Sequence, residues 1–371
     1  MRWICGITML ALAGCGGQAT PPPVYVGHVA TLSGAGKEEG EQASRGIRLA
    51  VQEQNKAAAE DNSRPVIVRH TDTHGNLEAF EAEAVRLVTV NRVLGLLGGV
   101  NGDEIARMDR AQAPLVSPFG MRLRNQSEMV FLTGLSPAFQ GRTLARYAGE
   151  KAGPVQVVIL ADERREDALA LADAFARAFP KSVKNAKAQV PRPITWRYGK
   201  EKDPLPDLNK RLAAEKPGVI LVAGSGADLL QFRKNFPASA LVLFGGDNPG
   251  RAVLDSADSD GVILAVPFVV DADVPLAKEF VASYRKAFNE DPDSSAALAY
   301  DGARLLFEAI KKSQPQPGSD KIAKELAKMK DFPGLTGPVS FGEDHHLRRP
   351  AFLVRVEKGR LQTIQRVAAE E

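Results

Sequence analysis

Short apolar runs recur along the chain and are separated by more polar segments. Val24–Ala30 is the first such run, and Val66–Val68 forms the centre of the second. Runs of this length without polar alternation are typical of strands buried on both faces, as in parallel sheets. We therefore predict strands at 24–30, 65–70, 93–97, 114–117, 155–160, 219–222 and 241–244.

Between these runs, the apolar residues follow a helical period. In the segment 77–90, Phe80, Ala84, Leu87 and Val88 lie on one helical face. Similar patterns predict helices at 42–55, 106–112, 168–179, 229–235, 278–288 and 296–312. Because strands alternate with helices in two successive blocks, the sequence predicts two doubly wound α/β lobes with parallel sheets.

The C-terminal segment has a different pattern. Ala351–Val356 and Leu361–Val367 flank the turn Lys358-Gly359-Arg360, which predicts an antiparallel hairpin at a sheet edge. In open α/β sheets, ligands bind beyond the carboxyl ends of the strands. We therefore expect site residues in the loops 31–40, 71–76, 98–104, 117–122, 162–167, 224–228 and 245–250.

The N-terminal residues are typical of a targeting segment. Arg2 precedes the apolar run Ile4–Ala13, which is shorter than the roughly twenty residues that a membrane span needs. The run ends in Leu12-Ala13-Gly14-Cys15, which resembles the bacterial lipoprotein box. We predict a signal peptide at 1–14, a lipidated Cys15, and a Gly/Pro-rich tether over 15–23. The alternative is a plain signal peptide with an incidental cysteine.

Composition narrows the possible classes of protein. The chain has 371 residues, of which 44% are hydrophobic and 25% charged, as in ordinary globular proteins. The formal net charge of +3 argues against a dedicated nucleic-acid binder. Cys5 and Cys15 are its two cysteines, so a disulfide scaffold and a Cys-ligated metal centre are both excluded. The predicted mature fold contains no further cysteine and depends on its two cores for stability.

Several loop and strand motifs occur in an order that resembles the periplasmic leucine/isoleucine/valine-binding proteins. The resemblance covers about residues 24–367 and is carried by the order and spacing of its motifs. The motifs are Leu32-Ser33-Gly34 with Gly40 and Ser44-Arg45-Gly46, then Asp72, Leu97-Gly98-Gly99, Pro114-Leu115-Val116-Ser117-Pro118, Ala299-Tyr300-Asp301 and Gly334-Leu335-Thr336-Gly337-Pro338-Val339-Ser340-Phe341.

The resemblance implies a type I periplasmic binding protein with two lobes joined by a three-segment hinge. The N-terminal lobe would comprise 24–137 plus 268–342, and the C-terminal lobe 138–267 plus 343–371. Such a protein closes on a small polar ligand, here an amino acid or close relative, and delivers it to the permease of an ABC importer. We expect an extracytoplasmic monomer that meets the membrane through its lipid alone. The alternative within this fold is a sensor that reports ligand without transport.

The resemblance also implies several ligand-binding residues. Asp247 falls where the family places a carboxylate for the ligand's ammonium group, although a helix-capping role is the alternative. Ser117 and Phe119 belong to a segment whose amides and hydroxyls meet the ligand, and Met121 replaces a usual hydroxyl there. Ser33, in the first motif, is a further candidate.

This chain departs from the family pattern at three further places. Asn101 and Gly102 stand where the family has hydroxyl residues, although backbone amides there can still hold an anion at a helix start. Glu39 and Glu166 replace common aromatic residues. If both line the cleft with Asp247, a cationic ligand would suit it better than leucine. Ser225, between two glycines, is either a ligand-facing hydroxyl or part of a tight turn.

Catalytic and metal sites find little support in the sequence. Gly34–Glu38 lacks the spacing and hydroxyl residue of a phosphate-binding loop, and Gly224-Ser225-Gly226 lacks that of a nucleophile elbow. His70, Asp72 and His74 share one strand face, but two ligands four residues apart on a strand are about 13 Å apart. His345-His346 and Arg348-Arg349 are interpreted as exposed loop residues. We expect no enzyme activity, no cofactor and no metal.

Overall fold

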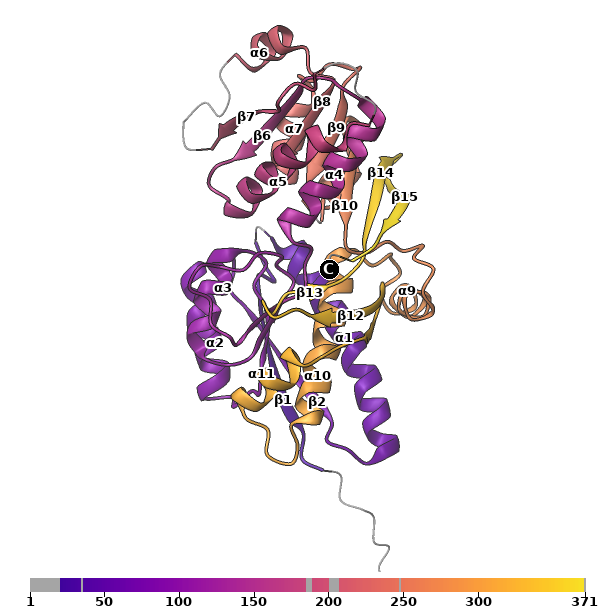
Figure 1. The fold of residues 1–371 in the computed structure, drawn as a ribbon. Coiled ribbons are helices and arrows are strands. Elements are labelled where there is room, and N and C mark those ends of the chain that lie inside the picture. Colours follow the sequence, from indigo (N-terminus) through magenta and orange to yellow (C-terminus); the bar gives the residue numbers. More distant parts are fainter. Residues whose placement is uncertain (1–20, 35, 185–188, 200–206, 247, 370–371) are drawn as a thin grey trace, which may run out of the picture.

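The chain forms two α/β lobes that lie end to end, with the C-terminal lobe uppermost in Figure 1. A computed structural model describes residues 21–34, 36–184, 189–199, 207–246 and 248–369. Both predicted parallel sheets are confirmed. Within the described ranges, no helix is both long and apolar enough to cross a bilayer.

The N-terminal lobe is built on a five-stranded sheet in which every strand pair is parallel. Its spatial order is β2-β1-β3-β4-β5. The strands are β1 (Val24–Ala30), β2 (Val66–Asp72), β3 (Leu96–Gly98), β4 (Leu115–Ser117) and β5 (Val130–Leu132).

Helices cover both faces of this sheet. Ile47 and Ala296 pack with Val26 on one face, whereas Phe80 and Ile105 belong to the core on the other. The two cores use alternate residues of the strands, as the period of two in a strand requires. The helices of this lobe are α1 (Lys37–Asp61), α2 (Leu77–Thr89), α3 (Gly102–Met108), α9 (Pro275–Phe288), α10 (Ser294–Lys312) and α11 (Ser319–Ala327).

The C-terminal lobe contains a seven-stranded sheet in the order β15-β14-β10-β9-β8-β6-β7. Five of these strands are parallel, and the hairpin predicted from the turn at Lys358 and Gly359 pairs antiparallel at one edge. Both turn residues have positive φ, as a two-residue hairpin turn of type I′ requires. The strands are β6 (Val157–Asp162), β7 (Ile194–Tyr198), β8 (Val219–Ala223), β9 (Leu241–Gly245), β10 (Ile263–Val266), β14 (Ala351–Glu357) and β15 (Arg360–Val367).

The helices of this lobe also lie on both faces of its sheet. Leu144 and Phe175 pack with Ile159 on one face, and Phe232 packs with Leu160 on the other. The helices are α4 (Pro137–Ala152), α5 (Glu166–Ser182), α6 (Leu208–Glu215), α7 (Gly226–Arg233) and α8 (Arg251–Leu254).

The two parallel sheets share one topology. The order β2-β1-β3-β4-β5 in one lobe corresponds to β7-β6-β8-β9-β10 in the other. In each lobe the strand order therefore reverses beside its first strand, between β1 and β3 and between β6 and β8. The crevice beyond such a reversal is where doubly wound sheets bind ligands.

Three connections join the lobes, at residues 133–136, 267–274 and 349–350. A small antiparallel sheet of β11 (Phe332–Gly334), β12 (Gly337–Phe341) and β13 (Leu347–Arg348) precedes the third. Because Leu347 pairs with Phe341, this crossing lies later than the boundary at 342/343 that the resemblance implied. The first two crossings lie at or next to the expected boundaries, and the division into moving lobes stays a prediction.

Three residues near the third crossing differ from expectation. His346 is buried, and its Nε2 lies 2.7 Å from the carbonyl oxygen of Gly134 at the first crossing. His345 stacks on Phe131 with ring centroids 4.5 Å apart. Arg349 is also buried. The interpretation of these residues as exposed was therefore wrong, because the crossings bring distant segments together around them.

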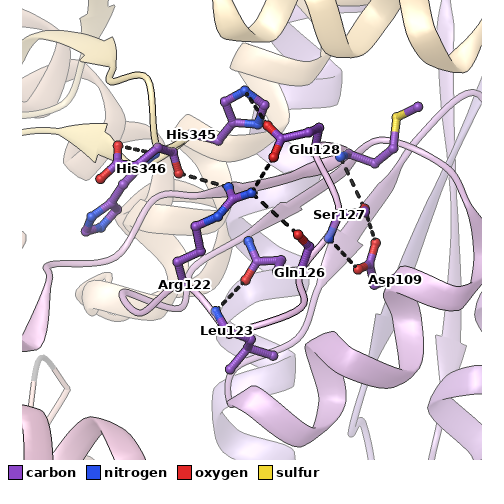
Figure 2. Close-up of polar contacts among 10 residues, drawn as sticks. Asp109, Arg122, Leu123, Gln126, Ser127, Glu128, His345 and His346 are labelled. Atoms are coloured by element: carbon purple, nitrogen blue, oxygen red, sulfur yellow. Dashed lines mark hydrogen bonds and ion pairs between the residues drawn. The ribbon is translucent and has the colours of Figure 1, made fainter.

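A polar cluster fixes the loop before the third crossing to the N-terminal lobe (Figure 2). The Arg122 guanidinium donates to the carboxylate of Glu128 at 2.7 Å and to the carbonyl oxygen of Asp344 at 3.1 Å. Glu128 also lies 3.4 Å from the Nε2 of His345. Asp109 holds the neighbouring Ser127 through its backbone amide and its hydroxyl.

Local capping explains one shift in the predicted elements. The helix expected at 106–112 begins earlier, at Gly102, because the side chain of Asn101 accepts the amide N–H of Glu104 at 3.0 Å. An asparagine in this position satisfies a helix-start donor that otherwise lacks a partner. The cap places the start of α3 directly after β3.

Candidate functional site

A cleft between the lobes is lined by residues of both, with a volume of about 670 Å³ including the space at its mouth. The N-terminal lobe contributes loops after β3 and β4 and the start of α10. The C-terminal lobe contributes loops after β6, β8 and β9. These are the strand ends at which the sequence predicted the site.

The wall from the N-terminal lobe is mainly apolar. Val100, Pro118 and Phe119 line it, and Phe119 also packs into the core beneath. A Cβ at Gly120 would lie 1.9 Å from the carbonyl oxygen of Leu135, so only glycine permits this contact with the first crossing. Glu39, from the first turn of α1, adds a carboxylate to this wall.

The wall from the C-terminal lobe carries both signs of charge. Arg165, just before α5, and Asp167, in its first turn, both line the cleft. The Arg165 guanidinium contacts the two Asp167 carboxylate oxygens at 3.2 and 2.6 Å. A helix start carries partial positive charge, which stabilises an acidic residue in this position. Gly224, Gly245 and Gly246 line the remainder of this wall.

Asn248 connects the two lobes across the cleft. It follows β9 of the C-terminal lobe, and its Nδ2 donates to the carboxylate of Asp293 at 3.1 Å and to the Ser295 hydroxyl at 2.8 Å. Asp293 caps α10 of the N-terminal lobe by accepting the amide N–H of Ala296 at 2.9 Å. Burial raises the pKa of Asp293, against the opposing effect of these hydrogen bonds. Side-chain hydrogen bonds of Asn248 therefore join the two lobes at the cleft.

A second cavity lies within the N-terminal lobe beyond the ends of β1, β3 and β4. Its volume is about 970 Å³ including the space at its opening. Most residues that line it are apolar or glycine. The polar ones are His28, Thr31, Glu39, Asn101, Glu104 and Thr133. Glu39, Val100, Pro118 and Leu298 line both this cavity and the cleft.

At the start of α3, a side chain of the protein itself accepts a backbone N–H that a ligand could otherwise use. The Glu104 carboxylate accepts the backbone N–H of Val100 at 2.8 Å, and burial raises the pKa of Glu104. Asp103 beside it is exposed. The amide of Val100 is thus already occupied by a side chain of this chain, which makes this helix start a poorer site for a ligand carboxylate than the hydroxyl-rich start expected in the family.

Three of the residues predicted for the site line one or both cavities. Glu39 and Phe119 line the cleft, and Asn101 lines the second cavity while capping α3. Asp247 lies outside the described residues, although Gly246 and Asn248 on either side of it line the cleft.

The other predicted residues lie elsewhere. Ser33 bonds His74 at 2.6 Å, and the buried hydroxyl of Ser117 donates to the carbonyl oxygen of Gly99. Met121 packs against the N-terminal core. Glu166 is exposed at the start of α5. The remaining two are at helix starts beside the cavities: Gly102 begins α3, and Ser225 forms a capping box with Asp228 at the start of α7.

Several cleft residues were not predicted from the sequence. Arg165 and Asp167 belong to a run of charges that resembles a solvated turn, and Asn248 immediately follows the predicted Asp247. Their positions directly after β6 and β9 were the available signal. The others come from the first turns of α4 and from α10, where no strand end points to a site: Gln140, Ser294, Ser295 and Leu298.

The histidines at the edge of the N-terminal sheet pair with local partners. His28 and His70 are register partners on β1 and β2, with Nδ1 atoms 2.9 Å apart, and burial lowers the pKa of both. Asp72 accepts the amide N–H groups of Leu32 and His74, each at 2.9 Å. Among the described residues, no group of three or more His, Cys, Asp or Glu side chains could hold a metal ion.

Comparison with known proteins agrees with this geometry. Residues 23–360 match the family described as periplasmic binding protein, and the chain belongs to that family. It is similar to a Leu/Ile/Val-binding protein homologue of Brucella abortus (strain 2308), with 23% identity over 329 residues and 82% of each chain covered. Periplasmic binding proteins act outside the cytoplasm.

Solved structures reproduce the two-lobed fold. One is the substrate-binding protein LivJ of a Streptococcus pneumoniae branched-chain amino acid transporter, in complex with isoleucine, at 24% identity and a TM-score of 0.75. It aligns over 94% of this chain and 100% of its own. Another is an ABC-transporter solute-binding protein of Rhodopseudomonas palustris BisB5 in complex with 3,4-dihydroxybenzoic acid, at 21% identity, a TM-score of 0.78 and coverage of 94% and 98%. The two neighbours thus hold chemically different ligands.

Proposed function

We propose that this protein is a solute receptor that closes its two lobes on a small polar ligand, an amino acid or close relative, and delivers it to an ABC importer. The observation that carries the proposal is the cleft itself. Residues of both lobes line it, and Asn248 bridges them through Asp293 and Ser295. A ligand that contacts both walls favours the closed state over the open one.

The charges around the cleft support a zwitterionic ligand. Glu39 stands on one wall, and Arg165 and Asp167 on the other. Arg165 and Asp167 pair with each other, so the cleft presents both signs of charge, and a ligand's ammonium or carboxylate would compete with that pair. Asp247, between Gly246 and Asn248 in the sequence, remains the proposed ammonium partner. One structural neighbour holds isoleucine and another 3,4-dihydroxybenzoic acid. Because these ligands differ in chemistry, experiment has to determine which kind of side chain the ligand of this protein carries.

A thermal-shift screen tests the ligand class directly. Amino acids, amides, polyamines and aromatic acids are compared at equal concentration, because a ligand that binds only the folded state raises its stability by mass action. We expect the largest shift among zwitterionic amino acids. Absence of a shift with any amino acid, confirmed by calorimetry, would contradict the proposal.

The proposed ammonium site has its own test. Asp247→Ala should weaken binding of an amino acid by about 2–5 kcal/mol, because it removes one partner of a desolvated charge pair. The matching carboxylic acid without the amino group should lose little. Equal affinity of wild type and variant for the amino acid would place Asp247 outside the site.

A cationic ligand is the second candidate. It is favoured by Glu39 in the cleft and by Glu104 in the adjoining cavity, and disfavoured by Arg165. Calorimetry that detects leucine but no polyamine or basic amino acid would exclude it.

We also propose that Cys15 carries a lipid that anchors the receptor, a monomer, to the membrane beside its permease. Cys15 lies outside the described residues, and the proposal depends on Leu12-Ala13-Gly14-Cys15. Cys15→Ser should move the full-length protein from the membrane fraction to the soluble fraction of the producing cell. Retention of the variant in the membrane fraction would contradict lipidation.

A further inference from the structure

We propose that the binding space has two compartments and that the physiological ligand is elongated. Its polar head group lies in the cleft, and its apolar body enters the cavity within the N-terminal lobe. This inference deepens the proposed function and depends on it, because the head group is held by the cleft described above.

The two spaces adjoin. Glu39, Val100, Pro118 and Leu298 line both the cleft and the cavity. These four residues come from α1, the loops after β3 and β4, and α10, so they surround the junction from several sides. Glu39 is the residue that replaces a common aromatic side chain of the family. Glu39 is half-buried, and a large ring at its position would narrow the junction.

The wall of the cavity suits an apolar guest. Ala43 and Ile47 of α1, Leu97 and Val116 of the sheet, and Ala299 of α10 all line it. Its glycines add little side-chain bulk. An apolar group of a ligand in this space would be removed from water on several sides, which is the main source of affinity for such groups.

Polar side chains at the cavity already have partners within the protein. His28 lies 2.9 Å from His70, and burial holds the pKa of His28 well below its usual value. The Glu104 carboxylate accepts the N–H of Val100, and the Thr133 hydroxyl donates to the carbonyl oxygen of Ser117 at 3.0 Å. These groups would keep their hydrogen bonds within the protein when an apolar group enters the cavity. Binding would therefore avoid much of the cost of burying unpaired polar atoms.

The cavity also occupies the place where this sheet topology favours a ligand. It opens beyond the carboxyl ends of β1 and β3, between which the strand order of the N-terminal lobe reverses. The cleft alone uses the loops after β3 and β4 from this sheet. The cavity adds the end of β1 through Val29, Ala30 and Thr31.

A chain-length series tests the inference. Isothermal calorimetry compares straight-chain 2-amino acids from four to ten carbons, and the straight-chain carboxylic acids of the same lengths. If the cavity receives the chain, Kd should fall about fourfold for each added methylene beyond six carbons. A site confined to the cleft should instead bind best near the length of leucine and lose affinity with longer chains.

Two variants reduce the cavity without altering the cleft. Ala43→Leu and Ala299→Leu each add bulk to its wall, from α1 and α10 respectively. Both should abolish the gain for eight- and ten-carbon ligands while retaining affinity for the shortest that bind. Ala57→Leu, at an exposed position of α1, is the matched control and should leave the whole series unchanged. Thermal melting of each unliganded variant verifies that it folds.

The outcomes separate the two levels of the proposal. Affinity that peaks at five or six carbons in wild type overturns the elongated ligand but leaves the proposed function intact. A long-chain gain that survives both folded filling variants also overturns it, because the chain then lies elsewhere. Absence of binding by either series at millimolar concentration overturns the elongated ligand, and the proposed function falls with it only if the thermal-shift screen also finds no amino acid that binds. If a filling variant fails to fold, the wild-type series still decides.

Discussion

The guanidinium of Arg349 donates to the carboxylate of Asp301 across 2.9 Å, and both side chains are buried where the chain crosses between lobes for the third time. Asp301 lies on α10 and also accepts the amide N–H of Leu335 at 3.1 Å. Arg349 donates to the carbonyl oxygen of Thr133 at the first crossing, at 3.2 Å. One ion pair thus joins two of the three crossings to the N-terminal lobe.

Arg349→Met should be strongly destabilising. It leaves the Asp301 carboxylate buried without its main partner, a change that typically costs about 3–5 kcal/mol. Urea unfolding at pH 7 measures the loss. Arg251→Met, which removes the exposed pair with Asp255, is the matched control and should cost no more than about 1 kcal/mol. Equal small losses in both variants would show that water reaches Asp301.

Acidification should reduce the deficit of Arg349→Met. Burial raises the pKa of Asp301 in the folded wild type, whereas Arg349 and Arg304 oppose that rise. Without Arg349, the folded-state pKa moves further above the unfolded value, so the folded state binds the extra proton and gains stability as pH falls. The difference between variant and wild type in unfolding free energy should therefore be larger at pH 8 than at pH 5.

The hinge illustrates what sequence reasoning could and could not reach. The motifs containing Asp301 and Leu335 identified the family, but their hydrogen bond joins residues distant in the chain. Arg349 was interpreted as solvated because its sequence neighbours are charged. Its burial depends on where the first and third crossings meet, which no local pattern encodes.

The same distinction applies to the site. Continuous apolar runs sufficed for both parallel sheets, and strand ends pointed to the loops of Glu39 and Phe119. Ser33 and Ser117 were expected to face the ligand, but their hydroxyls are used by His74 and by the carbonyl oxygen of Gly99. A sequence indicates a hydroxyl at a strand end without showing which nearby group takes its hydrogen bond.

Gly46→Ala should destabilise the N-terminal lobe, although alanine is the better helix former by about 1 kcal/mol. A Cβ at this position on α1 would lie 2.0 Å from the carbonyl oxygen of Ala296 on α10. Forcing the helices apart should cost about 1–3 kcal/mol in urea unfolding. Gly318→Ala, before α11 and with open space around its Cβ position, should change stability by less than about 0.5 kcal/mol. A stabilising effect of Gly46→Ala would refute the close approach.

Asn248→Ala should shift the unliganded protein toward an open form. It removes the donor to Asp293 and Ser295, and two hydrogen bonds of this kind contribute about 1–2 kcal/mol. The radius of gyration from small-angle X-ray scattering should increase, and the affinity of any bound amino acid should fall. Asn248→Asp, which retains an acceptor for Gly250 but places a carboxylate near Asp293, should open the protein at least as far.

Asn91→Ala is the control for this comparison, because Asn91 accepts a hydrogen bond from Arg86 entirely within the N-terminal lobe. Its scattering curve should match that of wild type. If Asn248→Ala also leaves scattering and affinity unchanged, the bridge does not contribute to closure.

Asp72 should make stability depend on pH at the acid end. Partial burial alone would raise its pKa, but hydrogen bonds from the amide of His74, the Ser33 side chain and the amide of Leu32 lower the pKa to about 2 from a usual 3.8. The folded-state pKa is therefore depressed, so the contribution of the carboxylate is present above about pH 4 and is lost as pH falls toward 2. Asp72→Asn removes it, since the amide side chain does not titrate.

Urea unfolding from pH 7 to pH 2.5 should give a stability gap between wild type and Asp72→Asn that narrows below pH 4. Glu279→Gln, at an exposed position of α9, controls for the loss of one surface charge. If the difference in unfolding free energy stays constant down to pH 2.5 after correction for the control, protonation of Asp72 does not reduce the stability of the protein in acid.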